Sequence, residues 1–319
     1  MADSLVLTDC QTDNDVSVRT TRAEMRADDI LADLPADTPV RYFTNFRHLT
    51  VTATEIISNL RENDYDGNQY LVILNISKYA ADKLLEDPDA LGGIPFRFAL
   101  DGKVGRIKVV PTSAHDCTTD NLRDEIGSEV LRMGVPRNDR QWGQMTSNPG
   151  SVSTKSKQPD QCFYPGSRRP MFSQLQGYPT LVVETGLTES LPRLRGDALW
   201  WFANSQGDTR MILIMSIRRA TRTVLMEVWQ LAPSGTPRLT RSIIDQFRSN
   251  NPLPMPPMVR QPAVSQQAYC IKELIITPTT IVGAPLILPF QAIFDRPSMG
   301  NERDIVLDAA ALMSIARPL

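Results

Sequence analysis

The chain is poor in the residues that build most metal and nucleophilic centres. Its 319 residues include two histidines and four cysteines, at His48, His115, Cys10, Cys117, Cys162 and Cys270. The cysteines show neither CxxC nor zinc-finger spacing. We therefore expect reduced thiols in an intracellular protein, with no histidine-based metal site or catalytic triad.

The chain also lacks an excess of one charge and any long apolar run. Its 34 basic and 36 acidic side chains give a net charge of -2, which argues against a protein that coats nucleic acid but leaves room for a local basic cleft. The longest apolar stretches, such as 212–217, have the length of a strand. Residues 1–14 show no basic start followed by an apolar run, so we expect no signal peptide, no membrane span and a cytoplasmic location.

The hydrophobic fraction of 41% is large enough for a substantial core. We expect one compact unit built from four segments. These are a polar tail, an N-terminal α+β part, a core, and a C-terminal extension with a proline-rich strap at 252–262, spanning 1–28, 29–110, 111–235 and 236–319.

Helical and strand patterns alternate through the middle of the chain. The expected elements are a helix over 118–133, strands over 160–164 and 180–185, a helix over 190–203, and strands over 210–217 and 224–231. A mixed central sheet flanked by helices, in an α/β (α+β) protein, is the simplest packing for this order.

Outside the middle, the patterns predict further elements at both ends. They are helices over 50–63, 77–85 and 304–316, a strand over 70–76, a hairpin of 96–100 with 106–110 around Asp101-Gly102, a loop over 138–150, and a sheet edge or turn over 286–294.

Two acids stand out in this frame. Asp160 follows a proline, and Glu184 ends an apolar strand. Burying an unpaired carboxylate costs roughly 3 kcal/mol or more, so Glu184 should meet a cation or hold a proton. Asp160 can equally be a turn residue after proline, and Glu184 can equally be part of a structural salt bridge.

The neighbouring helices each carry a charge on an apolar face. Arg195 lies within the apolar face of the 190–203 helix, and Glu184 is its expected partner. Glu129 lies within the apolar face of the 118–133 helix. Each can also be a rim residue whose stem alone is buried.

The loop before Glu184 and the helix after it supply candidate substrate contacts. Arg168 and Arg169 could meet a substrate phosphate, although loop arginines are commonly just solvated. Trp200 and Trp201 are the densest aromatic point; we expect Trp201 to lie on the core-facing side of the helix and Trp200 to point away from that side, where it could cover a second layer such as the C-terminal segment.

The Pro159-Asp160 step and the Glu184-Thr185-Gly186 run, set in a helix-strand-strand-strand-helix-strand order, resemble the PD-(D/E)xK restriction-endonuclease-like superfamily. Most of the chain also resembles a large group of uncharacterised fungal proteins with that core, through 183–201, 288–294 and 304–307. The resemblance implies a restriction-endonuclease-like core with N- and C-terminal additions.

The resemblance also implies roles for individual residues. Asp160 and Glu184 would bind a Mg²⁺ ion, and Glu129 would assist. The superfamily's lysine has no counterpart at Gly186, so Lys157 and Arg195 are the available cations.

Three functions are compatible with these residues. The leading hypothesis is a repurposed fold that binds or transforms a small organic molecule through acid/base residues and needs no cofactor, with nucleic acid as a possible but less favoured partner. The second is a divergent Mg²⁺-dependent nuclease that uses Lys157. The third is a non-catalytic module whose proline-rich strap docks on a protein partner.

Overall fold

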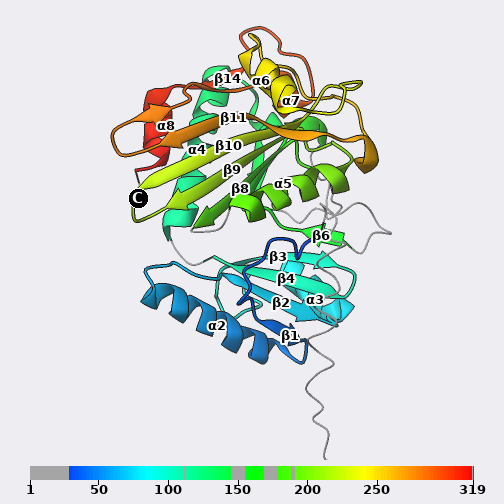
Figure 1. Cartoon of the computed structure of the whole chain (residues 1–319), viewed down its shortest axis with the longest axis vertical. Helices are drawn as coiled ribbons and strands as arrows, with labels where there is room; N and C mark the ends of the chain where they lie inside the picture. Colours follow the sequence, from blue (N-terminus) through cyan, green and yellow to red (C-terminus); the bar gives the residue numbers. More distant parts are fainter. Residues whose placement is uncertain (1–28, 111–112, 145–154, 169–177, 188–190, 318) are drawn as a thin grey trace, which may run out of the picture.

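The chain is a mixed α/β protein with two mixed sheets. The computed structural model describes residues 29–110, 113–144, 155–168, 178–187, 191–317 and 319. Its described part contains seven α-helices, one five-stranded sheet, one seven-stranded sheet and a two-stranded ribbon. The smaller sheet lies below the larger one in Figure 1. The mixed α/β class predicted from the sequence is thus confirmed, with the strands divided between two main sheets.

The five-stranded sheet belongs to the N-terminal part. Its order is β1 (Val40–Tyr42), β2 (Tyr70–Leu74), β4 (Val104–Val109), β3 (Phe96–Asp101) and β6 (Lys155–Lys157). Strands β3 and β4 form the expected hairpin, with Gly102 at a φ of 60° in its turn. Helices α2 (Phe46–Glu62) and α3 (Lys78–Glu86) bury apolar residues against this sheet. Strand β6, from the segment assigned to the core, pairs with β3.

The seven-stranded sheet forms the larger layer. Its order is β12 (Ile281–Val282), β11 (Ala268–Ile276), β10 (Thr223–Leu231), β9 (Met211–Arg218), β8 (Leu181–Leu187), β7 (Gln161–Tyr164) and β5 (Gln141–Gly143). Only the β8–β9 pair is parallel among its described pairings. All residues of β8 are buried, which explains why the strand begins with three consecutive apolar residues.

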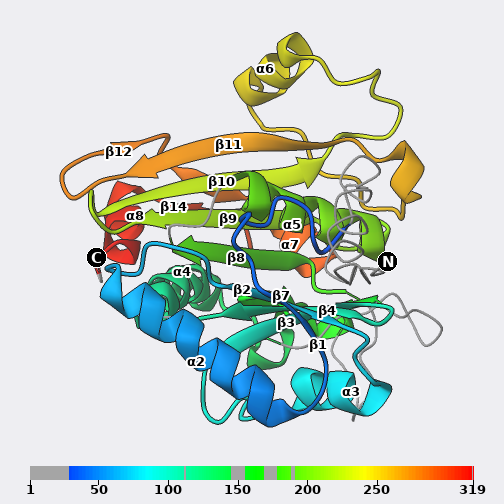
Figure 2. The same cartoon turned by 60° about the horizontal axis from the view of Figure 1, so that its bottom comes forward.

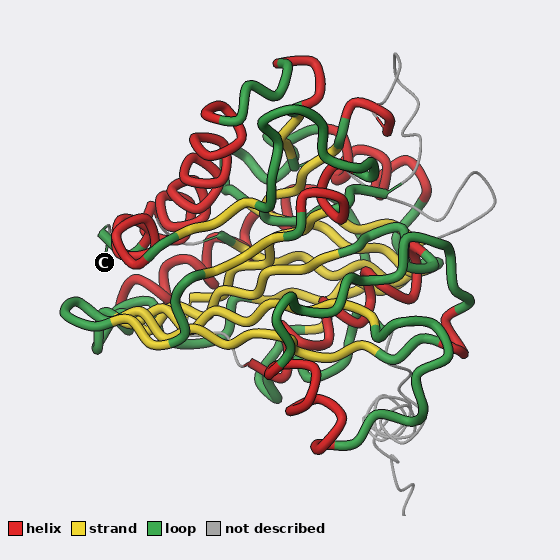
Figure 3. The backbone as a smooth tube through the Cα atoms, turned by 90° about the horizontal axis from the view of Figure 1, so that it is seen from above, coloured by secondary structure: helices red, strands yellow, loops and turns green. Residues whose placement is uncertain are grey.

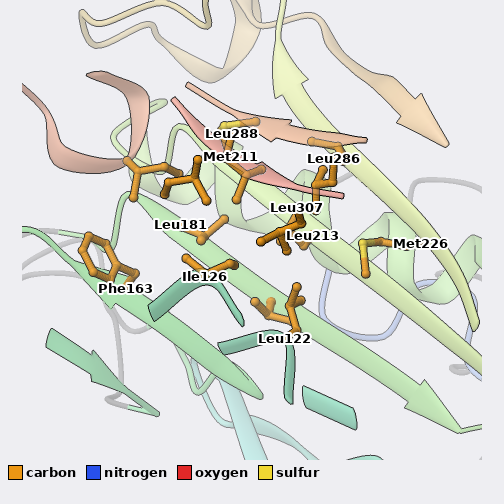
Figure 4. Packing of buried hydrophobic residues seen from close by; sticks show 14 of the residues in the cluster. Leu122, Ile126, Phe163, Leu181, Met211, Leu213, Met226, Leu286, Leu288 and Leu307 are labelled. Carbon is orange, nitrogen blue, oxygen red and sulfur yellow. The ribbon is translucent and has the colours of Figure 1, made fainter. Parts of the chain in front are cut away.

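Helices cover both faces of this larger sheet, as the view from above shows (Figure 3). Helix α4 (Ser113–Arg132) packs on one face together with α8 (Ala309–Ile315) and the β13–β14 ribbon (Leu286–Leu288 and Ile305–Leu307). Figure 4 shows this core, in which Leu122 and Ile126 of α4 approach Leu181 and Leu213 of the sheet. Helix α5 (Leu191–Ser205) lies on the opposite face, towards the smaller sheet (Figure 1).

Three sequence-based expectations are corrected by the structure. The expected 138–150 loop, which the structure describes as far as residue 144, overlaps a short 3-10 turn at Arg137–Asp139 and contains the edge strand β5. The 304–316 helix is a strand followed by a shorter helix, because buried Ile305 and Leu307 alternate with exposed Val306 before Asp308 caps α8. The 286–294 stretch divides in the same way into β13 and α7 (Phe290–Phe294).

The proline-rich strap over 252–262 follows α6 (Arg241–Ser249), which stands at the outer edge of the molecule (Figure 2). Hydrogen bonds hold the strap to its own chain. Gln230 Nε2 donates to Pro254 O at 2.8 Å, and Arg210 donates to Pro257 O and Met258 O, each at 3.1 Å.

No helix in the described ranges combines the length and the apolar character needed to cross a bilayer.

Candidate functional site: buried acids between the two sheets

Asp160 lies immediately before β7 and is 1% exposed. Lys108 Nζ, from β4 of the smaller sheet, lies 2.9 Å from Asp160 Oδ2, and Thr185 N of β8 donates to the same oxygen at 2.9 Å. Arg97 Nε and His115 Nε2 each lie 3.5 Å from the carboxylate. Burial raises the pKa of Asp160, but Lys108 and His115 outweigh burial and hold that pKa well below its usual range.

His115 joins this group from the first turns of α4. Its Nε2 lies 2.9 Å from Thr185 O, and its Nδ1 lies 3.1 Å from Asp116 Oδ1. A carbonyl and a carboxylate both accept, so both ring nitrogens can donate only in the imidazolium form. Burial lowers the pKa of His115, but the charge of Asp160 and the bond to Asp116 raise it further, to about 9.

Glu184 points from β8 towards α5. Lys157 Nζ lies 2.9 Å from Glu184 Oε1, and Trp201 Nε1 donates to the same oxygen at 2.6 Å. Burial raises the pKa of Glu184, partly offset by the Lys157 charge. Burial lowers the pKa of Lys157, opposed by the charges of Asp197 and Glu184. The two groups are therefore shifted towards each other, as in a proton-sharing pair.

Asp197 completes the cluster from α5. Lys157 Nζ lies 2.6 Å from its Oδ1, and Arg106 Nη2 donates to that oxygen at 3.0 Å. Arg193, one turn earlier on α5, also donates to Asp197. Burial raises the pKa of Asp197, but these cations, Arg106 first among them, bring it well below its usual range. Neither Lys157 contact has the angles of a hydrogen bond, so we treat both as close ion pairs.

The structure brings together three of the charged residues singled out in the sequence. Gln161 pairs with Val183 across β7 and β8, so the next position along places Asp160 opposite Glu184. Lys157 reaches Glu184 from the neighbouring sheet. The cluster is thus built across the junction of the two sheets, with cations from the smaller sheet on acids of the larger layer.

Arg195 does not meet Glu184. Its Nε donates to Glu227 Oε2 on β10 at 3.0 Å, and its side chain is 43% exposed. The periodicity of the helix shows which of its faces carries Arg195, but it does not show which strand of the sheet lies under that face. The expected Arg195–Glu184 pair is therefore wrong, and Trp201 and Lys157 take the place of Arg195.

Glu129 and Arg168 are used elsewhere. Glu129 pairs with Arg132 on its own helix and lies 3.6 Å from Arg303. Arg168 Nη2 lies 2.7 Å from Asp295 and so ties its loop to the end of α7. Neither contacts Asp160 or Glu184 in any described interaction. Arg169 lies outside the described residues.

Both tryptophans are buried and lie in one apolar cluster, so Trp200 joins the core although it does not share the helical face of Trp201. Trp200 is 1% exposed, and its ring meets that of Trp201 edge to face at 5.1 Å. The Lys157 ammonium lies 5.7 Å and 5.4 Å from the two ring centroids. The two indole rings therefore flank the Lys157 ammonium and stabilise its charge by cation–π contact.

Five members of the cluster were not identified from the sequence, namely Arg106, Lys108, His115, Arg193 and Asp197. The sequence pattern could have identified two of them, because Arg106 and Lys108 are charged residues on one face of a strand that is otherwise mostly buried and apolar. Asp197 follows Arg193 by one turn, which is a common surface pattern and therefore carries little information by itself.

A resident divalent ion does not fit this arrangement. Within the ranges that the structure describes, no three histidine, cysteine or acidic side chains gather as metal ligands would. Asp160 Oδ1 and Asp197 Oδ2 accept no hydrogen bond from the described residues, yet cations already stand beside both acids. Mg²⁺ prefers oxygen ligands and water, not a shell of ammonium groups.

Compared with protein-family models and with curated proteins, the chain matches none.

Proposed function

We propose that this chain is a nuclease-fold protein whose former catalytic edge now serves acid/base work on a small organic molecule. Among the elements of the seven-stranded sheet and its helices, the order α4, β5, β7, β8, α5, β9 supports the fold part of this proposal, since it follows the helix-strand-strand-strand-helix-strand pattern once β6, which joins the smaller sheet, is set aside. Asp160 before β7 and Glu184 within β8 hold the two acidic positions of that pattern.

The observation that carries the proposal is the lysine beside each acid. Lys157 Nζ and Lys108 Nζ lie 2.9 Å from Glu184 and Asp160, respectively. A divalent cation about 4 Å from one ammonium would be repelled by about 8 kcal/mol at an effective dielectric constant of 20. Metal-assisted phosphodiester hydrolysis is therefore the less favoured use of this site.

The Lys157–Glu184 pair supplies the chemistry. The pKa of Glu184 is raised and that of Lys157 is lowered, so moving a proton between them costs less than in water. Glu184 can take a proton from a bound molecule while Lys157 returns one. Trp201 holds Glu184 through its indole N–H, and Asp197 holds Lys157 from the other side.

Burial favours a small molecule over a polymer. Asp160 is 1% exposed and Glu184 is 2% exposed, whereas a nuclease must present its acids to a bulky backbone. Lys157 beside the second acid is nevertheless the arrangement that a divergent nuclease would need, so that function remains the second candidate. The interaction-module hypothesis gains less support, because the strap is hydrogen-bonded to its own chain.

The test compares Glu184→Gln with a matched control, Glu227→Gln. Glu184 and Glu227 both align with Ile214 of β9, both are buried, and each accepts from a tryptophan N–H. We would incubate each protein with a small-molecule extract and follow its components by mass spectrometry. Compounds consumed by the wild type and by Glu227→Gln, but not by Glu184→Gln, are the expected result. Equal consumption by all three proteins would refute the proposal.

A further inference from the structure

A short N-terminal turn covers the arginines that bind Asp197. Residues 30–33 form this turn, which lies between α5 and the smaller sheet (Figures 1 and 2). Ile30 is 2% exposed and belongs to the apolar cluster of Trp200 and Trp201. We call residues 29–33 the cover segment.

Two buried arginines are divided between Asp197 and this cover segment. Arg106 Nη2 donates to Asp197 Oδ1 at 3.0 Å, while its Nη1 donates to Ile30 O at 3.2 Å. Arg193 repeats the pattern, with one nitrogen on Asp197 and the other on Ala32 O. The Arg106 guanidinium thus gives one side to a carboxylate and the other to a neutral carbonyl.

A neutral carbonyl is the weaker acceptor of the two. A hydrogen bond from a guanidinium to a carboxylate is roughly twice as strong as one between neutral groups, and two guanidinium nitrogens match the two oxygens of a carboxylate. The same apolar cluster contains an unused donor, because Trp200 Nε1 has no hydrogen-bond partner among the described residues. The place now filled by Ile30 and Ala32 is therefore suited to an apolar molecule with an acidic end.

We propose that the cover segment stands in for a ligand, and that an apolar organic carboxylate displaces it to bind Arg106 and Arg193 beside Trp200 and Trp201. The inference rests on the proposed function and narrows its substrate class. The chain is held again at Pro39, whose carbonyl accepts from Val72 N of β2 at 2.9 Å. The cover segment can thus leave while the smaller sheet stays intact.

The test uses hexanoate as the probe and the neutral hexanamide as its control. Ile30→Ala empties part of the apolar slot and loosens the cover segment without touching either arginine. We expect hexanoate to bind this variant roughly tenfold or more tighter than the wild type, because the fraction of open protein rises. Hexanamide should bind neither protein. Ile315→Ala, the same change in the buried core of α8, controls for general loss of stability and should behave as wild type.

A second measurement reports on opening directly. Iodide should quench the tryptophan fluorescence of Ile30→Ala more than that of the wild type, and caesium should not, because the opened site is lined with guanidinium groups. Equal hexanoate binding by the wild type and Ile30→Ala would refute the proposal that the cover segment occupies the ligand site. No hexanoate binding by any variant would overturn the carboxylate class. Both results are separable from failure of the proposed function, which is judged by turnover that depends on Glu184.

Discussion

Replacing His115 by glutamine should remove a pH-dependent part of the stability. The pKa of His115 rises from 6.5 to about 9 in the folded protein, because the charge of Asp160 and the bond to Asp116 outweigh burial. A group whose folded pKa is raised stabilises the protein fully below its unfolded pKa, and that stabilisation is lost as the pH rises through the folded pKa. The window is therefore pH 6.5 to about 9. A shift of this size corresponds to roughly 3 kcal/mol.

The assay is urea unfolding of both proteins at intervals from below to above this window. The wild type should lose roughly 3 kcal/mol of unfolding free energy across the window relative to His115→Gln, whose side-chain amide can still donate to Thr185 O. His48→Gln is the control, since His48 is exposed at the start of α2 and is the only other histidine. If the curves of the wild type and His115→Gln run parallel, the buried His115–Asp160 contact does not exist as described.

Two further substitutions test the surroundings of the cluster, and a third tests the turn after β12. Asp197→Asn should lower the unfolding free energy by about 3–5 kcal/mol in chemical denaturation, because it leaves buried cations without their shared carboxylate; a loss below about 1 kcal/mol would contradict this. Trp201→Phe removes the donor to Glu184 and should raise the pKa of that carboxyl, seen as a shift in its infrared titration; an unshifted titration counts against the bond. Gly283→Ala should lower the melting temperature, since its φ is 94° and a Cβ there would lie 2.3 Å from Glu273 O; an unchanged melting temperature would be inconsistent with this turn.

The sequence was sufficient for features that depend on local pattern. The apolar residues that precede Glu184 in β8 marked it as a carboxylate that needs a partner, and its side chain is indeed paired. The Asp101-Gly102 step marked the β3–β4 hairpin. Both follow from short-range rules of burial and turn geometry.

The partners could not be predicted because they come from distant parts of the fold. Lys108 reaches Asp160 across 52 positions in the chain, and Arg106 reaches Asp197 across 91. These contacts form only where residues of β4 and β6 in the smaller sheet meet residues of the larger sheet and α5. The partner of Arg195 could not be predicted for a related reason. The periodicity of a helix shows which side of it carries Arg195, but not that Glu227 is the acid beneath that side.

The most direct test of the central claim is calorimetric titration of the wild type, Asp160→Asn and Glu184→Gln with Mn²⁺. If lysines neutralise the two acids in place of a metal, the three titrations should superimpose and show no saturable heat. A saturable one-site binding curve in the wild type that disappears in Asp160→Asn would contradict the replacement of the metal by lysines and would favour the nuclease function.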